Sequence, residues 1–272
     1  MPNRGRRGID MTTNRLDGRA ALISGGAGAM GAATARLFAE EGAAVCIADL
    51  DLEKAQQIAG QIEANGGRCK AVRLDVRNAA QWNGVVTDAE NALGHLDTLC
   101  SFAGANHRVS FDLQTEEMWR RILDINLTGC FLGTKIMLPA LRRAGGGVIL
   151  HTGSLGSLRQ GAGGPAYGVS KAGLVALTRS TAASYAADNI RCVLINPGHV
   201  DTPFIRGNAP HSPNDESTSI DNPDNYDRRV AATPLGRMTM PEDVARTFLF
   251  AASEEASMIT GSWINVDGGA GI

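Results

Sequence analysis

The sequence lacks the residue patterns of a metal site or of a disulfide framework. Its five cysteines are odd in number, widely spaced and without a C-x-x-C pair. Most of them fall in or beside apolar runs, where a free thiol packs as a small hydrophobe. The five histidines show no metal-ligand spacing. We therefore expect reduced, buried thiols in a cytosolic protein, and no metal.

Long apolar runs and an excess of charge are also missing. No apolar stretch reaches the ~18 residues that would span a bilayer, and a formal net charge of −2 gives no attraction to nucleic acid or to an anionic membrane. Arg4, Arg6 and Arg7 are not followed by the apolar core of a signal peptide. The prediction is a cytoplasmic protein with no membrane or nucleic-acid partner. Residues 1–15 are expected to be a disordered extension, with a nucleic-acid-binding arm as the alternative.

Short apolar runs alternate with amphipathic stretches over the rest of the chain. The predicted strands are 20–23, 43–48, 69–74, 96–102, 147–151, 190–195 and 263–266. The predicted helices are 32–41, 52–65, 79–93, 115–143, 166–187 and 241–252. Such alternation predicts an α/β fold, with residues 16–272 in a single doubly wound domain whose seven-stranded parallel sheet carries helices on both faces. The strands should be buried on both faces, and Pro139 should end or kink the long helix 115–143.

One segment, residues 202–234, breaks the alternation. It contains five prolines together with several Asp, Asn and Ser residues. Loops of this length inside a compact domain are usually lids, binding loops or disordered segments. Because it follows the sixth predicted strand, we expect it to project from the carboxyl edge of the sheet, where ligands bind, and to act as a lid over the substrate.

A glycine-rich turn follows the first predicted strand and leads into a helix. Gly26, Gly28 and Gly31 satisfy G-x-G-x-x-G in the strand–turn–helix context that this motif requires. Glycines permit a tight turn and let the backbone approach a pyrophosphate, to which the helix N-terminus presents free N–H groups. The turn therefore predicts a Rossmann-type, dinucleotide-binding domain.

An acidic residue, Asp49, ends the second predicted strand 21 residues beyond Gly28. A carboxylate at this position can accept hydrogen bonds from both ribose hydroxyls of NAD and repels the 2′-phosphate of NADP. No Arg or Lys stands beside it, the nearest in sequence being Lys54. NAD is therefore the predicted cofactor. The alternative is that Asp49 merely caps the helix entered near Leu52.

Tyr167 and Lys171 lie four residues apart on a predicted helix, so their side chains share one face. An ammonium group beside a phenol stabilises the phenolate and makes it useful in acid/base catalysis near neutral pH. Alone, this spacing also fits an ordinary surface pair. Ser154 ends the fifth predicted strand thirteen residues before Tyr167, where its hydroxyl can point into the same cleft and hydrogen-bond a developing alkoxide.

Together these motifs resemble the short-chain dehydrogenase/reductase family over about residues 16–270. The resemblance rests on the glycine turn, the acid after the second strand, and five further sets of residues: Asp75-Val76, the group Asn126, Ser154, Tyr167 and Lys171, Asn196-Pro197-Gly198 followed by Thr202, the segments Pro234–Arg237 and Pro241–Ala245, and Val266–Gly269.

The resemblance implies a role for each member of the catalytic set. Tyr167 would be the general acid for carbonyl reduction and the general base for alcohol oxidation. Lys171 would hold the nicotinamide ribose and stabilise the phenolate, and Ser154 would orient the substrate oxygen. Asn126 would hold a water in a proton relay, unless it is only a polar residue that kinks a helix.

The resemblance also implies a cofactor-binding set and a quaternary structure. The expected contacts to the dinucleotide are Gly25, Gly28, Ala29, Met30, Gly31, Asp49, Leu50, Asp75, Val76, Ala103, Gly104, Tyr167, Lys171, Pro197, Gly198, Val200 and Thr202. Asp75 and Val76 would border adenine, although Asp75 could simply cap the next helix. Residues 197–202 would border the nicotinamide, although they could form a plain turn. Relatives are commonly homotetramers, which use the helices beginning near Thr115 and Ala166 together with the last strand and its preceding helix.

Two positions depart from the family pattern. Ala29 replaces a glycine, so it must accept ordinary φ angles or the turn differs locally. Ser101-Phe102 replaces two asparagines after the fourth strand. The simplest interpretation of Phe102 is that it fills core space.

The predicted function is hydride transfer between NAD(H) and a secondary alcohol or ketone, small, uncharged and cyclic or steroid-like. Phe204, Ile205 and Tyr226 would either line the substrate pocket or anchor the lid. One alternative is a 3-oxoacyl-thioester reductase that uses NADPH. The other, of a different class, is a non-catalytic module that senses a dinucleotide.

Overall fold

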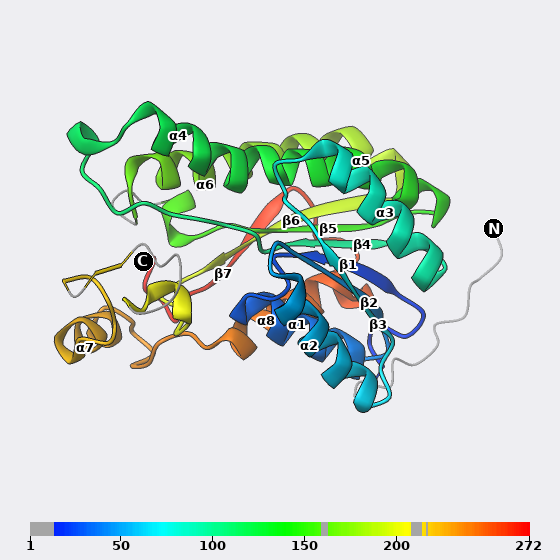
Figure 1. The fold of residues 1–272 in the computed structure, drawn as a ribbon, viewed down its shortest axis with the longest axis horizontal. Coiled ribbons are helices and arrows are strands. Elements are labelled where there is room, and N and C mark those ends of the chain that lie inside the picture. The colour runs from blue at the N-terminus through cyan, green and yellow to red at the C-terminus, as the bar shows by residue number, and fades with distance from the viewer. Residues whose placement is uncertain (1–13, 159–162, 208–213, 216) are drawn as a thin grey trace.

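The computed structural model describes residues 14–158, 163–207, 214–215 and 217–272. Its seven strands form one parallel sheet in the order β3-β2-β1-β4-β5-β6-β7 (Figure 1). The strands are β1 (Ala20–Ser24), β2 (Ala44–Asp49), β3 (Cys69–Arg73), β4 (Thr98–Ser101), β5 (Gly147–Thr152), β6 (Ile190–Pro197) and β7 (Ser262–Val266). The order reverses between β1 and β4, which confirms the predicted doubly wound fold and creates the crevice at which such sheets bind ligands.

Helices cover both faces of the sheet, as the alternating pattern predicted. The helices α1 (Ala29–Glu40), α2 (Leu52–Ala64) and α8 (Pro241–Ala252) lie on one face, while α3 (Ala79–Leu93), α4 (Glu116–Leu123), α5 (Gly129–Arg143) and α6 (Pro165–Tyr185) lie on the other (Figure 1). Short turns of 3-10 helix are η1 (Phe111–Leu113), η3 (Leu155–Ser157), η4 (Ala186–Asp188), η5 (Pro203–Ile205) and η6 (Glu254–Ala256). In the part of the chain that the structure describes, no helix is long and apolar enough to cross a membrane.

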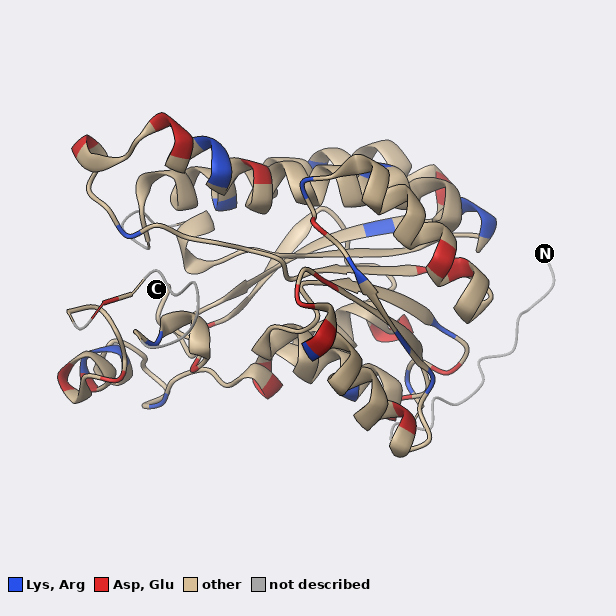
Figure 2. Ribbon diagram, viewed as in Figure 1, with Lys and Arg blue, Asp and Glu red and all other residues tan. Residues whose placement is uncertain are grey.

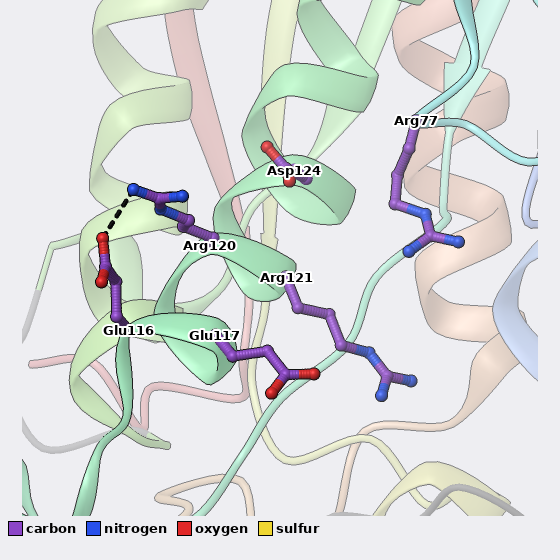
Figure 3. Close-up of a pocket in the computed structure, with 6 residues that line it drawn as sticks. All are labelled: Arg77, Glu116, Glu117, Arg120, Arg121 and Asp124. Carbon is purple, nitrogen blue, oxygen red and sulfur yellow. Dashed lines mark ion pairs between the residues drawn. The ribbon is translucent and has the colours of Figure 1, made fainter.

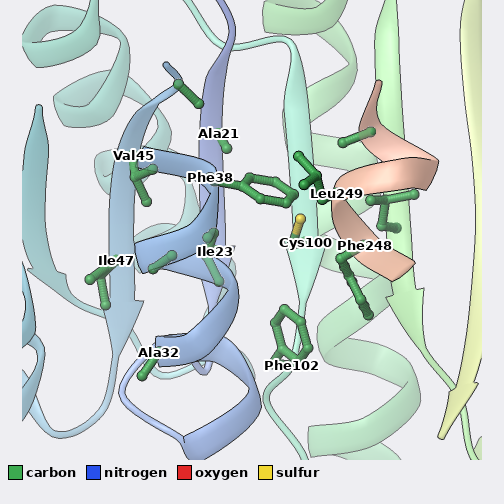
Figure 4. Packing of buried hydrophobic residues seen from close by; sticks show 14 of the residues in the cluster. Ala21, Ile23, Ala32, Phe38, Val45, Ile47, Cys100, Phe102, Phe248 and Leu249 are labelled. Atoms are coloured by element: carbon green, nitrogen blue, oxygen red, sulfur yellow. The ribbon is translucent and has the colours of Figure 1, made fainter. Parts of the chain in front are cut away.

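Two apolar layers, one on each face, hold the helices to the sheet. On the α1 side, Phe38 and Phe248 are fully buried against β1 and β4, as Figure 4 shows. On the other side, Trp82 and Leu141 belong to a second buried cluster. Burying a side chain of this size contributes roughly 1.5–3 kcal/mol. These layers fix the carboxyl ends of the strands, and hence the turns that follow them.

The two edge strands differ from the prediction that all strands are buried on both faces. Residues of β1 are buried throughout, whereas β3 and β7 alternate between exposed and more buried positions. An edge strand has only one neighbour, so part of its surface stays in contact with solvent. Strand order, which the sequence pattern does not contain, decides which runs take this position.

The predicted helix 115–143 forms as α4 and α5, joined by a π-helical turn, η2 (Asp124–Thr128). Of the two predicted effects of Pro139, ending the helix is wrong, because α5 continues to Arg143; a kink stays a prediction. Proline removes one backbone N–H, but here it lies near the last turn of a long and well-packed helix. The π-helical turn carries Asn126, and π-turns of this kind often occur at functional sites.

The N-terminal extension and the lid lie partly outside the described residues. The expected disordered extension falls on residues 1–13, which are not described, and on Asn14 and Arg15. The Arg15 N–H donates to Glu41 Oε2 at 3.0 Å, and its side chain pairs with Glu255 at 2.7 Å. Of the lid, residues 208–213 and 216 are not described. The rest contains η5 and the helix α7 (Pro223–Ala231).

All five cysteines are free, as predicted. Four are buried, and Cys69 is half-buried. Burial raises the pKa of the Cys46 and Cys192 thiols to about 12. These thiols stay protonated at neutral pH and serve as packing groups.

Candidate active site

The glycine turn joins β1 to α1 in a shape that leaves no room for side chains. Gly25 has a φ of +68°, and a Cβ there would overlap the backbone of Ala103. A Cβ on Gly31 would lie 2.5 Å from the Gly25 carbonyl oxygen. A Cβ on Gly26 would lie 2.8 Å from the Ile47 side chain, so this glycine serves packing between the turn and β2.

The first turn of α1 is open at its N-terminus. Its N-cap, Gly28, makes no side-chain capping bond, and the first turn contains no acidic residue. The N–H groups and positive dipole end therefore face outward beside the side-chain-free turn, as an anion requires. Ala29 begins α1 with an ordinary φ angle, which explains why this position tolerates alanine where the family has glycine.

Asp49 is the last residue of β2 and is tied to the glycine turn. Its Oδ2 accepts a hydrogen bond from the Ala27 N–H at 2.9 Å, and its Oδ1 accepts one from the Asp51 N–H at 3.0 Å. Helix α2 is capped by Asp51, which accepts from the Lys54 N–H. The alternative interpretation of Asp49 as that cap is therefore wrong. Leu50 is 58% exposed, on the surface beside the carboxylate.

Asp75 and Val76 follow β3 in a second turn at the same edge. Asp75 pairs with Arg77 at 2.6 Å, and hydrogen bonding from this guanidinium lowers the pKa of the Asp75 carboxyl. Asn78 is the residue that caps α3, so the interpretation of Asp75 as a cap is also wrong. Val76 is buried, and its carbonyl accepts a hydrogen bond from Trp82 Nε1 at 2.9 Å.

The turn after β4 explains the second departure from the family pattern. The ring of Phe102 packs on Phe248 with a centroid separation of 4.3 Å, so Phe102 fills core space as expected (Figure 4). Ala103 passes directly over Gly25. A Cβ on Gly104 would lie 3.5 Å from Asn126 Oδ1 and 3.8 Å from Lys171 Nζ. The turn therefore brings the backbone of residues 103 and 104 between the glycine turn and the predicted catalytic set.

Tyr167 and Lys171 occupy the first half of α6, on one face. Tyr167 is half-buried, whereas Lys171 is only 5% exposed. Lys171 Nζ lies 5.7 Å from the centre of the Tyr167 ring and donates to the Thr152 carbonyl oxygen at 2.7 Å. A buried ammonium costs free energy unless it is hydrogen-bonded. The interpretation as an ordinary surface pair is therefore wrong.

Ser154 lies just past the end of β5, at the start of η3. Its N–H donates to Asn196 Oδ1 at 3.1 Å, and its Oγ accepts from the Gly156 N–H at 3.1 Å. A side chain on Gly153 would overlap Asn196. These contacts hold the hydroxyl of Ser154 at the carboxyl edge of the sheet, where η3 packs against α6.

Asn126 is fully buried in the π-helical turn and connects three segments. Its Oδ1 accepts from the Ala105 N–H at 2.8 Å, and its Nδ2 donates to the Ala105 carbonyl at 2.9 Å and to Ser170 Oγ at 3.0 Å. Ser170 in turn donates to the Tyr167 carbonyl. Asn126 therefore lies within an irregular helical turn, and it also links the loop after β4 to the helix of Tyr167.

The segment after β6 packs closely against the segment after β7. A Cβ on Gly198 would lie 2.8 Å from Asp267, after β7, and its N–H donates to the Val266 carbonyl at 2.9 Å. Val200 forms an isolated bridge with Thr239, which ties together the two ends of the lid. Thr202 is buried, and η5 follows it. Pro197, the end of β6, and Thr202 therefore lie at the carboxyl edge.

The comparisons with known proteins agree with this geometry. Residues 25–271 match the family model described as enoyl-(acyl carrier protein) reductase. A curated relative, 2,5-dichloro-2,5-cyclohexadiene-1,4-diol dehydrogenase LinX of Sphingobium indicum, is 38% identical over 256 residues, covering 94% of this chain and 97% of that protein. The chain belongs to the short-chain dehydrogenase/reductase family.

Two further relatives extend the comparison of this short-chain dehydrogenase/reductase. The cis-4-hydroxycyclohexanecarboxylate dehydrogenase of Sinomonas cyclohexanicum is 38% identical over 253 residues, covering 92% of this chain and 96% of that protein. A crystal structure of 3-ketoacyl-(acyl-carrier-protein) reductase from Brucella melitensis complexed with NADH has a TM-score of 0.82 at 30% identity, covering 94% of this chain and all of that chain. The predicted fold, family and enzyme class are confirmed: the chain is an oxidoreductase of a family that binds nicotinamide dinucleotides.

One buried histidine behind the site was missed by sequence reasoning. In this short-chain dehydrogenase/reductase, His151 of β5 is fully buried, with Nδ1 at 3.2 Å from Ser101 Oγ and Nε2 at 3.3 Å from Thr134 Oγ1. Burial, and then the charge of Lys171, lowers its pKa to about 4. The imidazole is therefore neutral beneath the ammonium. A lone histidine in an apolar run gave no signal of these partners.

Sequence reasoning also missed a group of basic residues at the carboxyl edge: Arg108, His199 and Arg229. Arg108 comes from the loop between β4 and α4, His199 from the turn after β6, and Arg229 from helix α7. Isolated residues in three separate segments form no pattern along the chain, so no signal in the sequence points to them. In the part of the short-chain dehydrogenase/reductase that the structure describes, no group of three or more His, Cys, Asp or Glu residues could hold a metal.

An open hollow of about 690 Å³ lies beside α4. Three arginines and three acidic residues line it (Figure 3): Arg77, Glu116, Glu117, Arg120, Arg121 and Asp124. Glu116 and Arg120 pair at 2.6 Å. The opposite charges balance, so the hollow selects no ion of either sign, and none of the predicted catalytic residues lines it.

Proposed function

We propose that this protein oxidises a small cyclic secondary alcohol to a ketone, or catalyses the reverse reduction, with NAD(H). The observation that carries the proposal is the buried Lys171, held by the Thr152 carbonyl at 2.7 Å and set beneath the ring of Tyr167. This arrangement places a positive charge on the same helix face as the Tyr167 ring. The Tyr167 hydroxyl is then the group that exchanges a proton with the substrate oxygen.

Each catalytic residue has a separate role in this reaction. During oxidation, the hydroxyl proton of the substrate goes to Tyr167 Oη, and the C–H bond breaks with its electron pair. A bound nicotinamide supplies the acceptor for that hydride. Ser154 Oγ hydrogen-bonds the substrate oxygen as charge develops on it. Asn126 hydrogen-bonds the Ala105 backbone and Ser170, and so holds the loop after β4 against the part of α6 that carries Lys171. We propose that it also holds a water in a proton relay.

The residues at the carboxyl edge fit a dinucleotide. The side-chain-free turn at Gly25 and Gly31 and the uncapped α1 N-terminus suit a pyrophosphate. The remaining contacts would come from Ala29, Met30, Leu50, Asp75, Val76, Ala103, Gly104, Pro197, Gly198, Val200 and Thr202. Asp49 supports NAD over NADP, because its carboxylate is fixed at the ribose end of the turn by two backbone N–H groups.

The names of the relatives support a ring-shaped alcohol as substrate. LinX is named for a cyclohexadiene diol, and the Sinomonas relative is named for a hydroxycyclohexanecarboxylate. The alternative activity, reduction of a 3-oxoacyl thioester, is supported by the name of the Brucella enzyme, whose crystal structure is in complex with NADH. Asp49 argues against NADPH, the cofactor predicted for that alternative, since a carboxylate disfavours a 2′-phosphate.

We also propose the location and the assembly that the sequence predicted, a cytoplasmic homotetramer with residues 202–234 as its substrate lid. Exposed apolar side chains support the assembly: Phe131 of α5 is 46% exposed, Val169 of α6 48% and Trp263 of β7 42%. They lie on the elements that relatives of this family use for association. Burying large apolar side chains of this kind against a second copy of the chain would stabilise the assembly.

The test is NADH formation, followed at 340 nm, with cyclic secondary alcohols at pH 7 to 10. Tyr167→Phe keeps the ring but removes the proton-transfer group, so we expect kcat to fall at least 100-fold. Tyr185→Phe is the matched control on the same helix, because Tyr185 contacts Arg142 far from the site. Equal activity of the wild type and Tyr167→Phe, or no NADH from any alcohol, would contradict the proposal. Faster reduction of 3-oxoacyl thioesters by NADPH would support the alternative.

A further inference from the structure

Basic side chains from three distant segments gather at the substrate end of the site. Arg108 lies in the loop between β4 and α4, His199 in the turn after β6, and Arg229 in α7. Figure 1 shows α7 and the β4–α4 loop at the same end of the molecule, and Figure 2 shows basic residues on both segments. Strand order brings them together, because β4 and β6 both end at this edge.

The loop that carries Arg108 is packed directly against the start of the Tyr167 helix. Asn106 Oδ1 accepts from the Gly164 N–H at 3.2 Å, and a side chain on Gly164 would overlap the His107 carbonyl. A Cβ on Gly163 would lie 2.8 Å from both Asn106 Nδ2 and Tyr167 Cδ1. Arg108 therefore stands next to the first turn of α6, within the electrostatic influence of the Tyr167 hydroxyl.

The segment that carries Arg229 is held over the same edge by the C-terminal loop. The Leu235 N–H donates to the Gly268 carbonyl at 3.0 Å, and a Cβ on Gly271 would lie 3.0 Å from Leu155, next to Ser154. The guanidinium of Arg229 is oriented by one bond, from Nη2 to the Thr218 carbonyl at 2.7 Å. Its Nη1 is buried and has no hydrogen-bond partner among the described residues.

No carboxylate within the described ranges balances these two arginines. Neither Arg108 nor Arg229 forms an ion pair with an Asp or Glu of those ranges. Arg206, in the same lid segment, instead pairs with both Asp201 and Asp221, at 2.7 and 2.9 Å. The lid thus neutralises one of its arginines and leaves another with a buried donor unpaired.

The positive charges of these basic groups also repel one another. Desolvation, and then the charge of Arg108, lowers the pKa of Arg229. Desolvation also lowers the pKa of His199, and the charges of Arg229 and Arg108 lower it further. A buried donor without a partner and cations without counter-ions are both costly. A bound anion would remove both costs at once, since guanidinium groups form short, strong hydrogen bonds with carboxylates.

We propose that Arg108 and Arg229 form an anion subsite, and that the alcohol oxidised at Tyr167 carries a carboxylate on the side of the molecule remote from its hydroxyl group. This inference rests on the proposed function, and it replaces the expectation of an uncharged substrate. His199 lies beside the subsite as a neutral hydrogen-bonding group. Helix α7 then takes part in binding directly, because it carries Arg229.

The kinetic test compares two probes of the same shape, 4-hydroxycyclohexanecarboxylate and 4-hydroxycyclohexanecarboxamide, each as its cis and trans isomers. We expect the wild type to prefer the acid over the amide in kcat/KM by roughly 10- to 100-fold, the worth of a hydrogen bond to a charged group. Arg229→Met and Arg108→Met should abolish this preference and change the amide value less than about 3-fold. Arg229→Lys, which keeps the charge, should restore part of it. Arg246→Met is the control, because its side chain is 68% exposed on α8.

A binding test separates this inference from the proposed function. Calorimetry with cyclohexanecarboxylate and cyclohexanecarboxamide, in the presence of NAD, reports the subsite without turnover. Tighter binding of the acid to the wild type, lost in both arginine variants, supports the subsite even if no alcohol is oxidised. If cyclohexanol is oxidised but neither assay favours the acid, the proposed function stands and the anion subsite is overturned. Equal losses for acid and amide in the two variants would also overturn it.

Discussion

Replacing Asn126 with alanine tests how the irregular turn between α4 and α5 supports the site. Asn126 is fully buried and makes three hydrogen bonds, two to the backbone of Ala105 and one to Ser170. Asn126→Ala removes all three and leaves a small cavity. Ser170 keeps its bond to the Tyr167 carbonyl at 2.7 Å, whereas the Ala105 N–H and carbonyl lose their side-chain partner.

The expected loss of stability follows from these contacts. Each bond contributes about 1 kcal/mol net, and a buried partner left unsatisfied costs more. The sum is roughly 3 kcal/mol, which for a chain of this size lowers Tm by about 8 °C. Activity should fall as well, since Ala105 follows Gly104, the residue that passes between Asn126 and Lys171.

The assay is thermal unfolding followed by circular dichroism, with NADH formation measured at 25 °C on the same preparations. Asn83→Ala is the control, because Asn83 is exposed on α3 and its side chain only donates to the Ala79 carbonyl. A loss below 1 kcal/mol in Asn126→Ala, or an equal loss in both variants, would refute the view that Asn126 connects the loop to α6. Full activity at reduced Tm would limit its role to stability.

Three further predictions concern the cofactor, pH and assembly. Asp49→Ala should raise kcat/KM with NADP relative to NAD by roughly 10- to 100-fold, or about 1.4–2.7 kcal/mol, because it removes the repulsion of a 2′-phosphate; steady-state kinetics with both cofactors measures the ratio. The pKa of His151 is lowered from 6.5 in the unfolded chain to about 4 in the folded one, so stability should decline as the pH falls from 6.5 to about 4, by roughly 3 kcal/mol in total. Urea unfolding at several pH values should record this decline, and His151→Gln should flatten it. Phe131→Asp should shift the protein to a smaller assembly in sedimentation velocity, because it puts a charge on an apolar contact face.

Each of these predictions has an outcome that contradicts it. An unchanged cofactor ratio in Asp49→Ala would show that the carboxylate does not discriminate between the two dinucleotides. A decline with the same slope in wild type and His151→Gln would assign the pH dependence to other groups. A wild-type monomer, or a Phe131→Asp variant of unchanged size, would remove α5 from the assembly. Asp227→Asn, on the exposed side of α7, is a charge-changing control for the sedimentation experiment.

Much of the fold was determined by the sequence alone, since it depends on neighbours in the chain. Apolar runs separated by amphipathic stretches set the strands and helices, and their alternation implies parallel pairing with crossovers. The glycine turn is local in part: a side chain on Gly31 would collide within the turn, and Gly25 has a positive φ, whereas the collision of a Gly25 side chain with Ala103 depends on the turn after β4. Tyr167 and Lys171 share a face because the helical repeat places residues four apart together.

Which distant residues contact one another depends on how the elements pack in three dimensions. Strand order placed β3 and β7 at the edges. Packing between elements set His151 of β5 between Ser101 of β4 and Thr134 of α5, residues 50 and 17 positions away. It also brought Arg108, His199 and Arg229 from three segments to one edge without a carboxylate among them. A local sequence pattern does not specify such contacts, because they arise from packing between elements that are remote in the chain. The family and its chemistry could therefore be predicted from motifs, while the charge proposed for the substrate emerged only from the folded edge of the sheet.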